Sequence, residues 1–274
     1  MTQYNEISVK CKTEFIDILI AEFSVLGFDT FLENEQGFIT YNEENFDPSI
    51  LDSIQNQYGT LATFSYFIKE VEKQNWNEEW EKNYDPIIVE ETCVVKAAFH
   101  TNLPVYPIEL IITPKMSFGT GHHETTYSML AEMLTMDFKG KRVMDAGTGT
   151  GVLAILAQKQ GALKTFAFDI DDWCVENTIE NAEVNNVDLE VIQASIETLA
   201  LKPIYDVVLA NINKNILLAQ MNYYQESLKM GGDLLLSGFY LEDLEDIKQK
   251  AEEVGLKFKT NRMRNNWAMA RFNK

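Results

Sequence analysis

The chain has 274 residues, of which 46% are hydrophobic and 11% aromatic, enough to build two hydrophobic cores. No apolar run approaches the roughly 20 residues that cross a bilayer, and the first ten residues do not resemble a signal peptide, so we expect a globular, cytoplasmic protein with no membrane partner. The net charge of −19 repels phosphate backbones and attracts basic proteins, so we expect no direct binding of nucleic acid.

The negative charge is concentrated at the start of the chain. Residues 1–85 carry 17 acidic and 5 basic side chains, a net charge of −12, whereas residues 86–274 carry 25 and 18, a net charge of −7. This distribution favours a basic protein as the partner of the first third, although an acidic surface that serves only solubility has the same composition. The cysteines Cys11, Cys93 and Cys174 are odd in number and far apart, which predicts reduced, buried thiols rather than disulfides or a zinc site.

Residues 1–72 are predicted to form a small α+β domain with the order β-α-β-β-α-β. The apolar spacing predicts strands at residues 4–9, 28–32, 38–41 and 61–71, and helices at residues 14–26 and 47–58, with Gly27 and Gly59 ending the helices. This order is typical of a ferredoxin-like domain. No cluster of residues in it indicates chemistry, so a binding module and a packing appendage both remain open.

Residues 73–86 are predicted to be a helical linker. Trp76 and Trp80 lie four positions apart on one face of this charged stretch, which ends before Pro86. Two exposed tryptophans would form a large apolar patch, so we expect them to pack on one of the domains.

The third segment, residues 87–274, starts with strands at 92–99 and 108–112 and a glycine-containing loop at 114–127. A helix at residues 122–134 begins within this stretch, directly after the turn at residues 119–121, and its N-terminus suits a polar group of a ligand. Tyr127 stands where H-E-x-x-H would require histidine, so a zinc protease is excluded and we expect no metal. For His100, His122 and His123 we favour a capping or packing role over catalysis.

From residue 141 onward, strands and helices alternate. Strands are expected at residues 143–144, 165–168, 189–192, 205–210 and 234–237, and helices at 152–160, 171–185, 216–228 and 241–254, with Gly231 and Gly232 ending the third helix. Segments 256–259 and 267–272 form a closing antiparallel hairpin. Repeated β-α units predict a mostly parallel, Rossmann-like sheet whose strands all end at one edge.

The sequence VMDAGTGTG at residues 143–151 is the strongest indication of a ligand site. Gly147, Gly149 and Gly151 permit a tight turn that a ligand can approach closely, and Asp169, at the end of the next strand, can accept hydrogen bonds from a ribose diol. A dehydrogenase fingerprint would require glycine at Val152, so D-x-G-x-G-x-G favours a nucleoside site over a dinucleotide site. An ordinary βα turn is the alternative for the glycines alone.

Asn211 follows another strand of the same expected sheet. Gly147, Asp169 and Asn211 therefore converge on one edge, and three strand ends that meet are stronger evidence for a site than any single motif. Taken alone, Asn211 is more typical of a turn cap than of a ligand contact.

Four motifs carry a resemblance to a known family: FGTGHHETT at residues 118–126, DAGTGTGVLAI at 145–155, FDID at 168–171 and LANI at 209–212. They are similar to class I S-adenosylmethionine-dependent methyltransferases, and more closely resemble the ribosomal protein L-eleven methyltransferase (PrmA) family across essentially the whole chain. Asn213 stands where the family often has leucine.

The resemblance implies both a cofactor and a substrate. S-adenosylmethionine would be bound by Thr126, Gly147, Gly149, Asp169 and Asn211. The substrate would be a basic ribosomal protein, held by the ferredoxin-like domain and methylated on lysine side chains and the N-terminal amine. We expect a monomer.

The expected reaction transfers a methyl group in line to an uncharged amine. Desolvation lowers the amine pKa from about 10.4, so positioning by the FGTG loop and by the Asn211 carbonyl is expected to suffice, and no residue is assigned as a catalytic acid or base. The alternatives are a methyltransferase that acts on another basic protein or a small molecule, and a non-catalytic cofactor-binding assembly protein.

Overall fold

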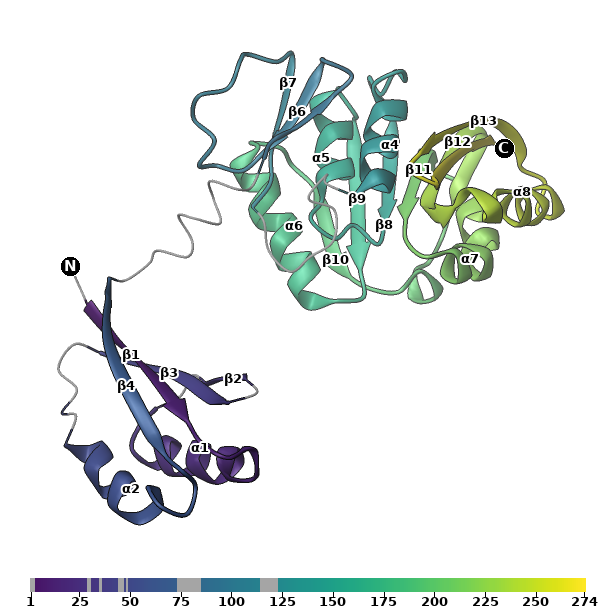
Figure 1. The fold of residues 1–274 in the computed structure, drawn as a ribbon. Coiled ribbons are helices and arrows are strands. Elements are labelled where there is room, and N and C mark those ends of the chain that lie inside the picture. Colours follow the sequence, from purple (N-terminus) through teal and green to yellow (C-terminus); the bar gives the residue numbers. More distant parts are fainter. Residues whose placement is uncertain are drawn as a thin grey trace. The chain divides into compact units, whose positions relative to one another are not determined.

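The computed structural model describes residues 3–28, 31–34, 36–43, 47, 49–72, 85–113 and 123–274. The chain divides into two compact units, Met1–Tyr84 and Asp85–Lys274, shown in Figure 1 and described here one at a time. The predicted linker helix with Trp76 and Trp80, and the FGTG loop at residues 118–121, lie outside the described residues.

The first unit contains a four-stranded antiparallel sheet in the order β2-β3-β1-β4. Its elements are β1 (Gln3–Lys10), a 3-10 turn (Thr13–Phe15), α1 (Ile16–Val25), β2 (Phe31–Asn34), β3 (Gly37–Glu43), α2 (Ile50–Tyr58) and β4 (Ser65–Glu72). Helix α1 ends before Gly27, whose φ of 91° requires a residue without a Cβ.

Both helices cover the same face of this sheet. Ile7 and Phe38 from the strands pack with Leu19 and Phe23 from α1 and Leu51 from α2, and all five are fully buried. On the opposite face, Leu32 and Phe67 are 54% and 67% exposed.

The second unit is built on a seven-stranded sheet in the order β10-β9-β8-β11-β12-β14-β13. The strands are β8 (Arg142–Ala146), β9 (Lys164–Asp169), β10 (Glu190–Gln193), β11 (Tyr205–Asn211), β12 (Leu228–Tyr240), β13 (Lys257–Arg264) and β14 (Trp267–Asn273). Strands β8 to β12 pair in parallel, and β14 pairs antiparallel with both β12 and β13. The predicted parallel sheet with a closing antiparallel hairpin is therefore confirmed.

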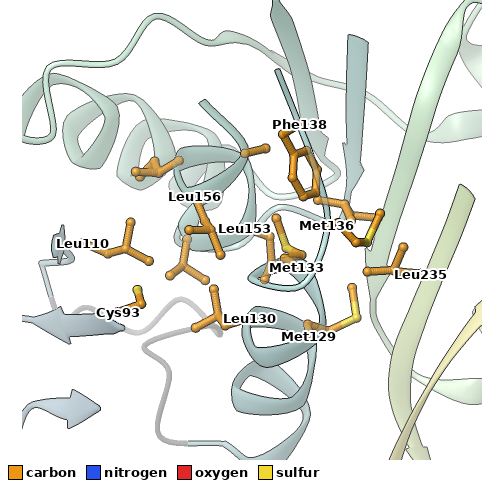
Figure 2. Packing of buried hydrophobic residues seen from close by; sticks show 14 of the residues in the cluster. Cys93, Leu110, Met129, Leu130, Met133, Met136, Phe138, Leu153, Leu156 and Leu235 are labelled. Atoms are coloured by element: carbon orange, nitrogen blue, oxygen red, sulfur yellow. The ribbon is translucent and has the colours of Figure 1, made fainter. Parts of the chain in front are cut away.

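Two hydrophobic cores cover the two faces of this sheet. Helices α4 (Glu124–Met133) and α5 (Val152–Lys159) pack on one face, where Met129, Met133 and Leu153 meet Leu235 of β12, as Figure 2 shows. Helices α7 (Lys214–Ser227) and α8 (Leu244–Glu253), the latter preceded by a 3-10 turn (Leu241–Asp243), pack on the other face. The remaining elements of this region are helix α6 (Asp172–Val184) and a 3-10 turn at Ile196–Thr198. No helix within the described ranges is long and apolar enough to span a bilayer.

A separate three-stranded sheet precedes α4. It contains β5 (Ile87–Val89), β6 (Cys93–Lys96) and β7 (Ile108–Ile111), with β5 antiparallel and β7 parallel to β6. Strand β5 was not predicted, because Pro86 and the acidic residues after Val89 leave a run of only three apolar residues. The strand expected at residues 92–99 is shorter than predicted.

The prediction that Gly231 and Gly232 end α7 is wrong. The helix ends at Ser227, and Gly231 and Gly232 lie inside β12 instead of stopping the helix. The Lys274 Nζ donates to the carbonyls of Gln225 and Leu228 at 2.7 and 2.9 Å, and so satisfies the last turn of the helix. This cap comes from the far end of the sequence, so no local pattern could indicate it.

Candidate functional site

A cavity of about 570 Å³ lies at the carboxyl ends of the parallel strands. It is lined by Gly147 and Gly149 after β8, by Asp169 at the end of β9 and by Asn211 at the end of β11. The predicted convergence of Gly147, Asp169 and Asn211 is confirmed, because parallel strands in a sheet bring their ends to one edge.

The glycine turn has the backbone conformation that its sequence predicts. Gly147, Gly149 and Gly151 have φ values of 72°, 57° and 80°, which side chains rarely tolerate. A Cβ on Gly147 would lie 2.5 Å from the Ile212 Cγ2 atom. The turn is therefore specific for glycine on geometric grounds.

Asp169 is held in one orientation by backbone amides. Its Oδ2 accepts a hydrogen bond from the Gly149 N–H at 3.0 Å, and its Oδ1 accepts from the Asp171 N–H at 3.2 Å. The side chain is 9% exposed and lines the cavity. Each carboxylate oxygen can accept a second hydrogen bond, so a ligand diol can still be bound.

Asn211 lines the cavity at the end of β11. Its Nδ2 donates to the Thr126 Oγ1 at 3.1 Å, which fixes the orientation of the amide. Its Oδ1 is buried and has no hydrogen-bond partner among the described residues. Thr126 is fully buried and contributes to the site through Asn211, and it does not line the cavity itself.

His123 caps helix α4, in agreement with the capping role that the sequence favours. Its Nδ1 accepts from the Thr125 N–H at 3.3 Å, and its ring packs edge-on against Trp267 with centroids 4.6 Å apart. The Tyr240 ring also packs against Trp267, with centroids 4.1 Å apart. His123 and Trp267 both line the cavity. Trp267 was not predicted as a site residue, because it comes from the closing hairpin, far from the motifs in the sequence.

Asp145 is the first residue of the D-x-G-x-G-x-G motif. It is 1% exposed, and its Oδ2 accepts from the Thr148 Oγ1 at 2.8 Å. Burial raises the pKa of Asp145 to about 7, against the opposing effect of the Thr148 hydrogen bond. This carboxyl therefore belongs to the interior of the glycine turn.

The strand order, the glycine turn after the first parallel strand and the fixed carboxylate after the second define a class I methyltransferase fold. The sequence model described as ribosomal protein L11 methyltransferase (PrmA) matches residues 24–274. The chain belongs to this family, and the resemblance seen in the motifs is confirmed.

Individual relatives agree with this assignment. The ribosomal protein L11 methyltransferase of Porphyromonas gingivalis is 46% identical over 260 residues, which cover 93% of this chain and 90% of the relative. The protein of the same name from Phocaeicola vulgatus is 41% identical over 268 residues, covering 96% and 95%. The crystal structure of ribosomal protein L11 methylase from Lactobacillus delbrueckii subsp. bulgaricus superposes with a TM-score of 0.65 at 26% identity and covers 70% of this chain and 99% of that one.

Proposed function

We propose that this chain transfers methyl groups from S-adenosylmethionine to ribosomal protein L11, on lysine side chains and on the N-terminal amine. Membership of the PrmA family and the names of the relatives support the cofactor and the substrate. The observation that carries the proposal is the buried, unpartnered Oδ1 of Asn211, which Thr126 holds at the cavity beside the glycine turn.

The residues at the cavity fit the cofactor. Asp169 has one free acceptor position on each oxygen and is assigned to the ribose diol. Gly147 and Gly149 are assigned to close approach of the cofactor to the backbone, since both line the cavity in conformations that favour glycine. Asn211, fixed by Thr126, is assigned to the end of the site where the amine enters.

When bound, the cofactor supplies a methyl group on a sulfonium for in-line transfer to nitrogen. The Asn211 Oδ1 accepts a hydrogen bond from the amine N–H and so directs the nitrogen lone pair. The apolar wall that includes Trp267 excludes water, which lowers the pKa of the amine and favours its uncharged form. We assign no catalytic acid or base, because the buried Asp145 does not line the cavity and His123 is engaged as a cap.

We further propose that residues 1–72 bind the protein substrate, that residues 73–86 link them to the enzyme and that residues 87–274 form the methyltransferase domain. The open sheet face of the first unit offers a binding surface, because the register aligns Leu32 with Ile39, Ile39 with Ser8 and Ser8 with Phe67 across four strands. Its acidic surroundings suit a basic protein. We place the reaction in the cytoplasm, carried out by a monomer that does not bind nucleic acid.

The test is methylation of a mixture of unmethylated ribosomal proteins with labelled S-adenosylmethionine. We expect label on L11, located by mass spectrometry to lysine and N-terminal amines. Asn211→Ala should lower kcat about a hundredfold through loss of amine orientation, whereas Asn222→Ala, at an exposed position on α7, should not.

The other outcomes identify the alternatives. Label on a different basic protein or on a small molecule would support a different substrate. Cofactor binding with no transfer to any of them would support a non-catalytic assembly protein.

A further inference from the structure

Helix α6 carries a row of buried polar side chains on one face. Asn177, Thr178 and Asn181 are fully buried, and Asn185, which caps the helix, is 5% exposed. The three asparagines are four positions apart and therefore share a face. A buried amide lowers stability unless its hydrogen bonds are satisfied. The hydrogen-bond partners of these side chains therefore show which segments the helix holds in place.

One set of partners is the free edge of strand β7. The Asn185 side chain accepts from the Ile111 N–H at 2.9 Å and donates to the Ile111 carbonyl at 2.6 Å, and the Asn181 Oδ1 accepts from the Thr113 N–H at 2.9 Å. Four helical residues rise by about 6 Å and two strand residues by about 6.6 Å, so the two spacings match. The asparagine side chains of the helix thus bind the backbone groups at the edge of β7 that a neighbouring strand would otherwise bind.

The other set of partners is the glycine turn of the cavity. The Asn181 Nδ2 donates to the Thr150 carbonyl at 2.9 Å, and the Thr178 Oγ1 donates to the Gly149 carbonyl at 3.1 Å. A Cβ on Gly151 would lie 2.8 Å from the Thr178 Cγ2, so the helix and the turn are in close contact. Asn181 is therefore bound to both the turn and the β7 edge.

We infer that Asn181 and Thr178 are positioning residues of the cofactor site, which hold the glycine turn in its ligand-binding conformation. A planar trans peptide directs its N–H opposite to its carbonyl, so a carbonyl bound to α6 turns the N–H of the same peptide unit away from the helix. Gly149 is held on both sides, because its carbonyl accepts from Thr178 and its N–H, which belongs to the preceding peptide unit, donates to Asp169. The inference rests on the proposed function, because it takes S-adenosylmethionine as the ligand.

Asn185 provides a matched control. It is buried on the same helix and makes hydrogen bonds of the same kind, but its partners are the Ile111 backbone and the Asn181 carbonyl, and it does not contact the turn. Replacement of Asn181 or Asn185 by leucine should therefore lower Tm to a similar degree. The two replacements should differ in their effect on the affinity for S-adenosylmethionine.

The experiment is calorimetric titration of the full chain with S-adenosylmethionine, well below Tm. We expect Asn181→Leu to raise Kd about tenfold and Thr178→Val about fivefold, with Thr178→Ser restoring the affinity and Asn185→Leu changing it less than about twofold. Steady-state assays should show a higher KM for the cofactor with a smaller change in kcat.

Each failure has a separate meaning. If the unaltered chain does not bind S-adenosylmethionine, the proposed function fails. If that chain binds and the two leucine variants lose affinity equally, or neither loses it, the positioning role is overturned. If Asn181→Leu does not fold, an unchanged Kd in Thr178→Val overturns it in the same way.

Discussion

At the scale of single residues, the partner of a polar side chain decides which of its atoms remains for a ligand. Thr126 accepts from the Asn211 Nδ2, and the buried Asn211 Oδ1 has no hydrogen-bond partner among the described residues. The N–H groups of Gly149 and Asp171 each donate to one oxygen of the Asp169 carboxylate, and each oxygen keeps a further acceptor position for a ligand. The site therefore presents acceptors, which suits hydroxyl and amine groups of a ligand.

The first residue-scale prediction concerns Asp169. Asp169→Ala should weaken S-adenosylmethionine binding by about 1.5 to 3 kcal/mol, the range for hydrogen bonds to a charged group, while the chain stays folded. Asp172→Ala is the control, since Asp172 is exposed and does not line the cavity. Calorimetry that gives equal affinities for the two variants would refute the ribose assignment.

The second residue-scale prediction concerns how protonation of Asp145 makes the free energy of unfolding depend on pH. Its pKa of about 7 in the folded chain exceeds the unfolded value near 3.8, so the folded state binds the proton more tightly. The stabilisation that this proton provides is complete below the unfolded pKa and is lost as the pH rises towards 7. The slope cannot exceed about 1.4 kcal/mol per pH unit.

Asp145→Asn removes this titration and keeps an acceptor for the Thr148 hydroxyl. We therefore expect the free energy of unfolding of the variant, relative to the unaltered chain, to increase between pH 5 and pH 8. Urea unfolding at both pH values measures the difference. A difference that stays constant over this range would show that Asp145 does not titrate there.

Local patterns predict part of this site and not the rest. The glycines and Asp169 were predicted because a strand, a turn and the next strand end lie within about 25 consecutive residues and have a characteristic spacing. The burial of Asp145, which raises its pKa, and the contact of Trp267 with His123 depend on packing between distant segments. No sequence window contains both partners of such a contact.

At the scale of elements, the closing hairpin fixes helix α4. Glu132 of α4, which is 5% exposed, accepts from Arg262 of β13 at 2.9 Å and from Arg271 of β14 at 3.2 Å. At the start of the helix, Glu124 pairs with Arg264. Because α4 carries Thr126, the hairpin sets how this hydroxyl meets Asn211 on β11.

Removal of the buried carboxylate tests this arrangement. Glu132→Ala removes the shared partner of two arginines, which keep Glu90 and Asp233 as their other partners, and should lower the free energy of unfolding by about 1.5 to 3 kcal/mol. Glu245→Ala breaks an exposed pair with Lys248, in which the Glu245 side chain is 81% exposed, and should cost less than about 1 kcal/mol. Equal shifts in urea midpoint would contradict a structural role for the network.

The elements themselves were largely predictable, since long amphipathic helices and buried strands have a clear period. The exceptions were the end of α7 and strand β5. Lys274 satisfies the α7 carbonyls from 46 positions beyond Leu228, and β5 is three residues long, too short for its period to be detected. Both depend on tertiary contacts rather than on local propensity.

At the scale of the whole molecule, two compact units have different surfaces. Residues 1–85 carry a net charge of −12, and the sheet of the first unit leaves Leu32 and Phe67 exposed. All residues assigned to the cofactor belong to the second unit. Binding of the protein substrate and binding of the cofactor should therefore respond separately to experiment.

The last prediction uses this separation. The rate of association with L11 should fall as salt rises, because screening weakens the attraction between an acidic surface and a basic protein, while cofactor affinity should change little.

A chain of residues 85–274 should still bind S-adenosylmethionine, since Thr126, Gly147, Asp169 and Asn211 are all present. It should lose most of its activity on L11, because the cavity alone must then capture a mobile, charged amine without a second binding surface. Stopped-flow binding at several salt concentrations and methylation assays on both chains decide the matter. Full activity of the shorter chain would show that the acidic unit does not bind the substrate, and would support its role as a packing appendage.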